Sequence, residues 1–231
     1  MWIIFAAVLT SLLFTSELFS QTIGLSFTSG FPMGEFKDNV DRPGFGVSGE
    51  LLLFTPTPEA PLTIGLNLGF LNYGSEISPE HFSSTIPDVW VDVERTNNIT
   101  NFHVLFKLAY PSGMIRPYAE GLFGGSYFYT DTKILTSGTE EISSTINYDD
   151  FAWSYGAGGG LLINLSSDPA SEVANFFLDL KVRYLFGSRA NYLKEGSISI
   201  ENGNVFYDVS RSKTELMTMN IGIAAYFTAI Y

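Results

Sequence analysis

Cysteine is absent from the 231 residues, which excludes disulfides, thiolate metal sites and a lipidated N-terminal cysteine. Basic residues are few, since 12 Lys and Arg stand against 24 Asp and Glu, for a formal charge of −12. This charge would repel nucleic-acid phosphates, so no nucleic-acid partner is expected. The sequence also lacks an apolar run of the roughly 18 residues that a membrane helix needs. If the chain sits in a membrane, it crosses the membrane as strands.

The N-terminal segment is a short, uncharged apolar run. It covers Met1–Phe14, and the small residue Ser20 follows it. Such a run is too short to span a bilayer and is typical of a secretory signal peptide, although no Lys or Arg precedes it. We predict a signal peptide over residues 1–20 and one domain over residues 21–231, long enough for a substantial core. The alternative for the first segment is a buried helix.

Alternation with period two runs through the rest of the chain. In Phe176–Phe186 the apolar side chains occupy one parity, while Asp179, Lys181 and Arg183 occupy the other. Successive side chains of a strand point to opposite faces, so such a stretch predicts a strand with one apolar and one polar face. Eight candidate strands follow this pattern: Thr22–Thr28, Gly44–Phe54, Leu62–Tyr73, Asn97–Tyr110, Ile115–Thr130, Phe151–Leu165, Phe176–Gly187 and Thr214–Phe227.

The connections between these strands alternate in length. The short ones are Thr55–Pro61, Pro111–Met114 and Ser166–Asn175, and the long ones are Ser29–Pro43, Gly74–Thr96, Asp131–Asp150 and Ser188–Lys213. The alternative is a soluble periplasmic barrel with an apolar interior. Nothing in such a barrel requires its connections to alternate between short and long. Short periplasmic turns and long extracellular loops are typical of outer-membrane barrels. We predict an all-β, eight-stranded antiparallel up-and-down transmembrane β-barrel, with apolar side chains toward lipid.

Aromatic residues cluster by depth on the predicted lipid-facing parity. Phe and Tyr are abundant, at 20 and 12 residues. Amphipathic rings favour the headgroup level of a membrane, so they are expected to form girdles at the two rims. The predicted extracellular girdle consists of Phe27, Phe45, Phe70, Phe102, Tyr127, Tyr129, Trp153, Tyr155, Tyr184 and Phe186.

Three segments carry a resemblance to a known family. They are Arg116–Gly121, Tyr155–Gly160 and Asn220–Phe227, each set within the eight-strand layout. Together they resemble the outer-membrane β-barrel domain family, which comprises eight-stranded barrels similar to outer membrane proteins A and X. The resemblance implies a protein of the bacterial outer membrane, exported by its signal peptide. It also implies a closing aromatic residue read by the assembly machinery, for which Phe227 and Tyr231 are both candidates.

The polar parity places a set of ionisable residues in the predicted lumen. Because an isolated buried charge is costly, these residues are expected to pair. Glu50 and Glu120 lie at mid-depth and are the predicted acceptors for Lys181, Arg183 or Arg116. A locked ion-pair network is one interpretation, and a narrow path for ions is the other. The predicted lumen charge network consists of Glu50, His103, Lys107, Arg116, Glu120, Asp179, Lys181 and Arg183.

No catalytic, cofactor-binding or metal site is predicted. A lipid-modifying enzyme is an alternative, because some barrels of this kind are lipid deacylases with a His/Ser pair two residues apart. Here His81 is followed at that spacing by Ser83, but in a loop, and His103 is followed by Leu105. Gly156, Gly158 and Gly160 lack the following helix of a dinucleotide loop. We expect these glycines to make room in the lumen for Arg or Tyr side chains opposite them.

The long loops are acidic. The acids of residues 74–95 and 131–150 face only Arg95 and Lys133 as basic residues. Within the last loop, Ser197–Val209 has Asn-Gly between two alternating runs, which predicts a hairpin, and Asp88–Glu94 also alternates. We expect a non-enzymatic protein with a structural or interaction role. Its expected partners are outer-membrane lipids, including lipopolysaccharide, and a protein bound at the extracellular loops.

Overall fold

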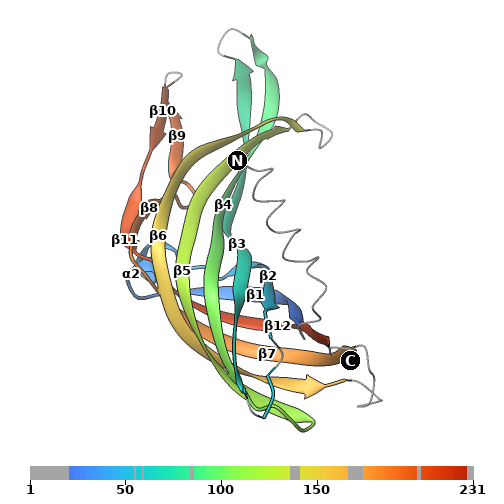
Figure 1. The fold of residues 1–231 in the computed structure, drawn as a ribbon. Helices are drawn as coiled ribbons and strands as arrows, with labels where there is room; N and C mark the ends of the chain where they lie inside the picture. The colour runs from blue at the N-terminus through green and yellow to red at the C-terminus, as the bar shows by residue number, and fades with distance from the viewer. Residues whose placement is uncertain are drawn as a thin grey trace, which may run out of the picture.

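The wall of the molecule is one closed sheet of eight antiparallel strands (Figure 1). The computed structural model describes residues 21–54, 56–58, 60–83, 86–135, 141–165, 174–201 and 204–227. The wall strands are β1 (Thr22–Met33), β2 (Gly44–Leu52), β3 (Leu62–Ser83), β4 (Ile86–Ala109), β5 (Ile115–Leu135), β6 (Glu141–Asn164), β7 (Ala174–Gly187) and β12 (Glu215–Phe227). They match the eight predicted strands in order, so the predicted eight-stranded barrel is confirmed. The proposed signal peptide, residues 1–20, lies outside the described residues.

The first and last wall strands close the sheet. β1 pairs with β12 from Thr22↔Tyr226 to Met33↔Glu215. The amide of Phe227 also donates to the carbonyl of Gln21 over 2.8 Å, which ties the two ends of the wall together. Closure leaves the barrel without an open edge, so its backbone groups can be satisfied inside the sheet, as lipid requires.

Four wall strands are far longer than the other four. β3, β4, β5 and β6 have 22, 24, 21 and 24 residues, whereas β2 has 9 and β1 has 12. β4 and β5 remain paired as far as Asp92↔Leu135, so these strands continue as a sheet beyond the barrel rim (Figure 1). The long connections predicted over 74–96 and 131–150 are therefore largely strand, as the alternation of Asp88–Glu94 indicated. The alternation of apolar residues ends where the strands leave the membrane. It therefore predicted the end of the lipid contact, whereas the strands themselves continue.

The last long connection folds into two small sheets. β8 (Arg189–Tyr192) pairs with β11 (Ser210–Lys213), and β9 (Ile198–Glu201) pairs with β10 (Asn204–Tyr207). The second pair confirms the hairpin predicted from the Asn-Gly signal. The Asn-Gly dipeptide itself lies outside the described residues.

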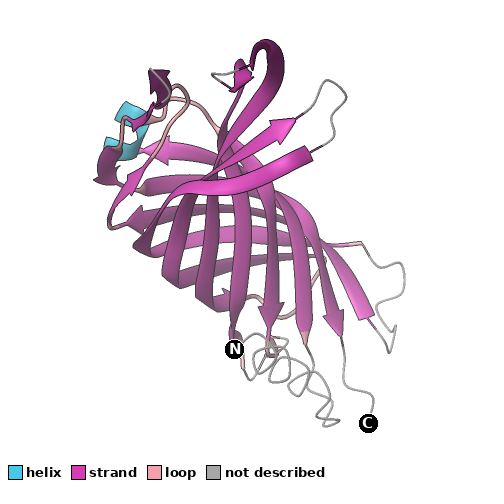
Figure 2. Ribbon diagram, turned by 90° about the horizontal axis from the view of Figure 1, so that it is seen from above, coloured by secondary structure: helices cyan, strands magenta, loops and turns pink. Residues whose placement is uncertain are grey.

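One short helix was not predicted. α2 (Gly34–Asn39) follows β1 and lies at the end of the barrel that carries the long connections, beside the short strands (Figure 2). Six residues are too few for a helical period to appear in the sequence. Among the described residues, no helix has the length and apolarity needed to cross a bilayer.

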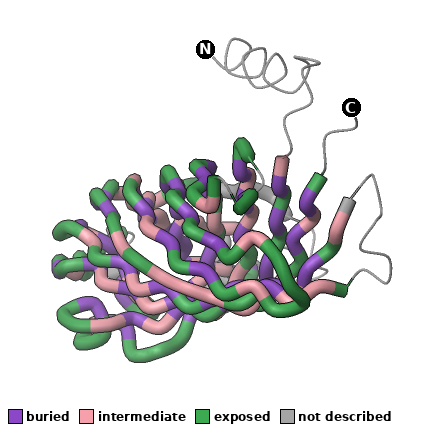
Figure 3. Tube along the Cα trace, turned by 60° about the horizontal axis from the view of Figure 1, so that its bottom comes forward, coloured by how far each residue is buried: buried purple, intermediate pink, exposed green. Residues whose placement is uncertain are grey.

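Burial alternates along the wall strands (Figure 3). In β7, Val182 is 47% exposed, whereas Lys181 and Arg183 on either side are each 3% exposed. The apolar parity therefore faces outward and the charged parity faces the lumen. This is the reverse of a soluble sheet, which hides its apolar face from water.

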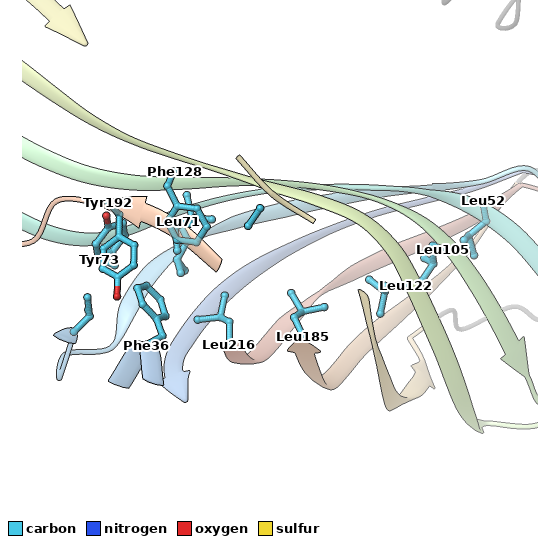
Figure 4. Close-up of a cluster of buried hydrophobic side chains, with 14 residues drawn as sticks. Phe36, Leu52, Leu71, Tyr73, Leu105, Leu122, Phe128, Leu185, Tyr192 and Leu216 are labelled. Carbon is cyan, nitrogen blue, oxygen red and sulfur yellow. The ribbon is translucent and has the colours of Figure 1, made fainter. Parts of the chain in front are cut away.

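The buried apolar side chains run along the lumen and gather at its two ends. At the long-loop end, Phe36 of α2 lies among Tyr73, Phe128 and Tyr192, and leucines continue from there down the barrel (Figure 4). At the short-turn end, a second cluster consists of Ala109, Tyr118, Leu162, Phe177, Ala224 and Tyr226. The charged lumen residues alternate with these leucines, as Lys107 does with Leu105 on β4 and Arg183 with Leu185 on β7.

Candidate functional site in the lumen and its cap

Glu50, on β2, is the centre of a buried ion-pair network. Its Oε1 atom accepts from Nζ of Lys107 over 2.7 Å. Its Oε2 atom lies 2.9 Å from Nζ of Lys181 and 2.8 Å from Nη2 of Arg183. A single carboxylate thus holds three cations from β4 and β7. Charges enclosed in this way avoid the cost of an unpaired buried ion.

Two further acids complete the network. Glu120, on β5, accepts from Nε of Arg183 over 2.6 Å and lies 3.9 Å from Nζ of Lys107. Asp179 lies 2.9 Å from Nζ of Lys181. The three acids and three bases carry no net charge together. We propose that they form a structural plug and not an ion path.

Tyr118 extends the network toward the short-turn end. Its hydroxyl donates to Oδ1 of Asp179 over 2.6 Å, and Nζ of Lys107 lies 4.4 Å from the centre of its ring. Sequence reasoning did not single out Tyr118, although it shares its parity with Glu120. Its position two residues before Glu120 would have placed its hydroxyl in the lumen.

Glycines on β6 make room for the network. A Cβ atom added at Gly158 would lie 2.8 Å from Cγ of Arg183, and one added at Gly160 would lie 2.6 Å from the hydroxyl of Tyr118. Both are closer than side chains normally approach, so only glycine leaves space for these neighbours. The structure places an arginine and a tyrosine against these glycines, where the sequence led us to expect side chains of this kind.

Arg116 departs from the predicted network. It is only partly buried, its guanidinium lies 4.6 Å from the ring centre of Phe177, and it donates to the carbonyl of Gly113 over 3.2 Å. None of the ion pairs of Glu50 or Glu120 described above involves it. The sequence predicted that the side chain of Arg116 faces the lumen, but not how far along the barrel axis it lies. Arg116 is the second residue of β5, so it lies at the short-turn end of the lumen.

His103 lies in the lumen against Ser154 of β6. Its Nε2 atom and the hydroxyl of Ser154 are 3.0 Å apart, and both residues are almost fully buried. The search for a His/Ser pair two residues apart missed this contact because the partners lie 51 residues apart, on β4 and β6. The side chains of His81 and Ser83 lie outside the described part of the chain.

Phe36 seals the long-loop end of the lumen. Its ring lies 5.9 Å from that of Tyr73, 5.8 Å from that of Phe128 and 5.1 Å from that of Tyr192, each in an edge arrangement (Figure 4). Edge-to-face contacts of this kind add to the stabilisation from burial. At the short-turn end, the rings of Phe177 and Tyr226 lie 4.7 Å apart. Sequence reasoning found no signal for Phe36, which stands in a polar connection.

A small polar cavity separates the outer seal from the ion pairs. Its volume is about 20 Å³, which suffices for roughly one water molecule. Arg183 lines it together with side chains of β7 and β12, and Leu71 and Leu185 also border it. The other polar residues around it are Thr28, Ser48, Asn67, Asn101, Thr218 and Asn220.

The predicted aromatic girdle lies on the outer surface of the wall. Trp153 is 60% exposed, and the rings of Phe27 and Phe45 stack at 6.3 Å. Tyr155 and Phe186 stack at 5.5 Å across β6 and β7. The other members, Phe70, Phe102, Tyr127, Tyr129 and Tyr184, are also exposed or partly exposed. These rings therefore face away from the lumen.

Polar contacts fasten the long connections to one another and form a cap over the barrel. Oε2 of Glu35 accepts from the amide of Lys213 over 3.1 Å, and Oε1 lies 3.5 Å from Nη2 of Arg189. Arg42 forms an ion pair with Glu195. We use "cap" for α2, the strands β8–β11 and the turns between them.

The acidic residues of the long loops are spread over the strand extensions. Asp92 and Asp149 are exposed, Glu76 accepts from the amide of Gly196 over 2.9 Å, and Arg95 is buried. The side chains of residues 80–90 and 135–144 lie outside the described part. In the described part, no group of three His, Asp or Glu side chains is arranged to hold a metal ion.

Comparisons with known proteins found distant likenesses to solved structures alone. No family model matches the sequence, and no curated protein is similar to it. Ail, the attachment invasion locus protein of Yersinia pestis, has 14% identity and a TM-score of 0.42, over 91% of this chain and 99% of that chain. Neisserial surface protein A has 9% identity and a TM-score of 0.42, over 89% and 96%. A major outer membrane protein from Thermus thermophilus has 14% identity and a TM-score of 0.36, over 90% and 99%.

Identities and TM-scores this low carry no argument about function, so the assignment rests on the geometry of the chain. The sheet is closed, its outer surface is apolar and aromatic, and its charges are enclosed and paired. Only a lipid surround makes such a surface favourable. The chain has the fold of an eight-stranded transmembrane β-barrel.

Proposed function

We propose that the protein is a non-conducting, non-catalytic barrel that holds a folded cap and acidic strand extensions outside the membrane as an interaction platform. The observation that carries this proposal is the combination of a filled lumen with long connections that fold into strands and a helix. A filled lumen argues against transport as the main role. Folded loops cost little entropy when a partner binds, which favours recognition.

The packing of the lumen supports a closed barrel. The ion pairs of Glu50 join β2 to β4 and β7, and so they cross the lumen. The described cavity between these pairs and the outer seal has a volume of only about 20 Å³. A hydrated ion would have to displace paired charges in order to pass, which is costly at low dielectric.

The position of the His/Ser contact supports a non-catalytic role. His103 and Ser154 both face the lumen and are 3% and 2% exposed. The ester and amide bonds of membrane lipids lie outside the wall, so neither group reaches them. A catalytic pair would need access to its substrate within hydrogen-bond distance.

The acidic surface indicates the chemistry of a partner. Asp92 on β4, Asp149 on β6 and Asp208 beside β10 are all exposed on the long-loop side. Complementary charge raises the rate and the specificity of association, so a cationic protein segment is the favoured partner.

Addition of a strand to the sheet extension is less favoured. Pro79 on β3 lacks an amide donor, which disrupts a regular ladder there. The pairing of β5 with β6 also carries register shifts between Thr130 and Asp131 and between Ile134 and Leu135. Such irregularities make a strand edge a poor template for a further strand.

Conductance and mass spectrometry test the first half of this proposal. In planar bilayers we expect no discrete conductance steps, and Glu120→Lys should not create steps of defined size. Lipopolysaccharide incubated with the protein should keep its mass. Regular steps whose size changes with Glu120→Lys would favour the narrow pore, and loss of an acyl chain would favour the lipid-modifying enzyme.

Binding to charged peptides tests the second half. Protein in nanodiscs should bind a lysine-rich peptide, and this binding should weaken at high salt and in an Asp92→Asn/Asp149→Asn variant. A glutamate-rich peptide of the same length is the control and should not bind. Equal binding of the two peptides would contradict a role for the acidic strand extensions.

A further inference from the structure

α2 depends on tertiary contacts for its existence. It has six residues, and no side chain caps its N-terminal end at Met33. Helices of fewer than about 12 residues are marginal on their own in water. Gly34, its first residue, has φ = +52°, a conformation that glycine adopts without strain. The segment therefore holds its helical form only while something seats it.

The seat is provided by Phe36. This side chain is fully buried among Tyr73, Phe128 and Tyr192, whereas Lys37, the next residue, is exposed. The three surrounding rings belong to β3, β5 and β8, so they stay in place when α2 leaves. The seat is a preformed aromatic pocket of the cap and the wall.

The seated phenylalanine covers the route into the outer half of the lumen. Phe36 belongs to the same buried cluster as Leu71 and Leu185. Both leucines also line the small polar cavity whose wall includes Ser48 and Arg183. Removal of the ring would bring water next to the leucines that separate this cavity from the outside.

The ion pairs of α2 and of the turn after it are exposed, as is the contact of Glu35 with the amide of Lys213. Glu35 pairs with Arg189 and Arg42 pairs with Glu195, all through side chains that are at least one-third exposed. Exposed ion pairs stabilise weakly. A cleft of about 550 Å³ lies beside the segment, between Asp38–Arg42 on one side and Lys194–Gly196 on the other. This cleft gives the segment room to move without displacing a wall strand.

We propose that α2 is a lid, which is seated by Phe36 over the outer half of the lumen and unseats while the barrel stays folded. This inference goes beyond the proposed function, because it turns one of the two seals into a movable element. The cluster of Phe177 and Tyr226 remains closed when the lid opens, so opening exposes the polar cavity but creates no pore. The cavity would then become a vestibule reached only from outside the cell.

The absence of cysteine allows a direct test with single-cysteine reporters. Ser48→Cys places a thiol at the cavity, where the native residue is 6% exposed, and Thr22→Cys places one near the short-turn end, where it is 2% exposed. Each reporter is labelled in nanodiscs with a charged methanethiosulfonate reagent. The rate of labelling then measures how often water reaches each position.

The lid predicts different responses from the two reporters. Phe36→Ala should speed labelling of Ser48→Cys by at least about tenfold, since even a modest loss of seating energy shifts the open population that far. The rate at Thr22→Cys should not change. Lys37→Ala, on the exposed face of the same helix, is the matched control and should leave both rates unchanged.

Two results would overturn the proposal. One is an unchanged rate at Ser48→Cys in Phe36→Ala, which would mean that α2 covers nothing. The other is equal acceleration at Thr22→Cys, which would mean that the whole barrel has loosened. If Phe36→Ala fails to fold, Phe36→Leu and Glu35→Gln serve in its place, with smaller accelerations expected at Ser48→Cys alone. The labelling assay measures neither conductance nor peptide binding. The lid can therefore be disproved while the proposed function stands, and the reverse.

Discussion

At the scale of single residues, Glu50 contributes more to the lumen than any other side chain described. It alone contacts Lys107, Lys181 and Arg183. Its position on the lumen parity of β2 was visible in the sequence, but the number of its partners was not. The pairing depends on which strands face one another across the lumen, and barrel closure decides that.

Glu50→Ala tests how much this carboxylate contributes to the free energy of unfolding. The substitution leaves three cations short of an acceptor, so the free energy of unfolding should fall by about 3–5 kcal/mol. The measurement is urea-induced unfolding in lipid vesicles, followed by tryptophan fluorescence. Glu195→Ala removes an exposed ion pair and should cost less than about 1 kcal/mol. Similar losses in the two variants would show that the buried network is dispensable.

Gly158→Ala tests the need for space in the lumen. The added methyl group would lie 2.6 Å from the carbonyl oxygen of Val182, so a loss of about 1–3 kcal/mol in unfolding free energy is expected. Gly121→Ala is the matched control, because its methyl group meets no described atom within 4 Å. It should change stability by less than about 0.5 kcal/mol. The same vesicle assay compares them, and a harmless Gly158→Ala would contradict the packing argument.

At the scale of elements, the wall strands and the hairpin of β9 and β10 were predictable, and α2 was not. Lipid contact imposes a strict alternation on β1, β2, β7 and β12, so their limits agree with prediction within about two residues, except that β1 runs on to Met33. β3–β6 continue outside the membrane, where no such pattern is imposed. α2 was missed because its order comes from the pocket around Phe36, and residues distant in the sequence build that pocket.

The contact between α2 and β11 should depend on pH. The amide of Lys213 and the charge of Arg189, against an opposing effect of burial, lower the pKa of Glu35 below its ordinary value of 4.5. A lowered folded-state pKa stabilises the contact above pH 4.5 and loses this effect as the pH falls through the lowered value. Hydrogen exchange of the Lys213 amide, corrected for its intrinsic rate, should therefore accelerate below about pH 4.5. In Glu35→Gln this acceleration should be absent, and its persistence would place the titrating group elsewhere.

At the scale of the whole molecule, the wall has apolar side chains outside and charged ones inside, and this arrangement requires a membrane. Leu25 and Leu68 on the outer surface are 66% and 63% exposed, while Lys107 in the lumen is 1% exposed. In water this arrangement would expose a large apolar surface and promote aggregation. In a bilayer the same surface is solvated by acyl chains.

Val182→Lys tests this polarity. Val182 is on the outer surface of β7 between two residues of the ion network, so a charge there would face acyl chains and cost about 2–4 kcal/mol. The control is Val205→Lys on β10, where the native side chain is 48% exposed outside the barrel. The control should change stability by less than about 0.5 kcal/mol. Folding into vesicles, read as heat-modifiable migration on gels, compares the two, and equal folding yields would argue against a lipid-facing Val182.

The sequence by itself determined the class of the protein, because a bilayer acts on every strand in the same way. Period-two alternation, the parity of Lys181 and Arg183 and the alternating loop lengths follow from that single constraint. The tertiary structure alone decided which charges pair, why Arg116 stays at the mouth and how α2 closes the other end. Those outcomes depend on the stagger between strands and on contacts between distant loops, which no local pattern records.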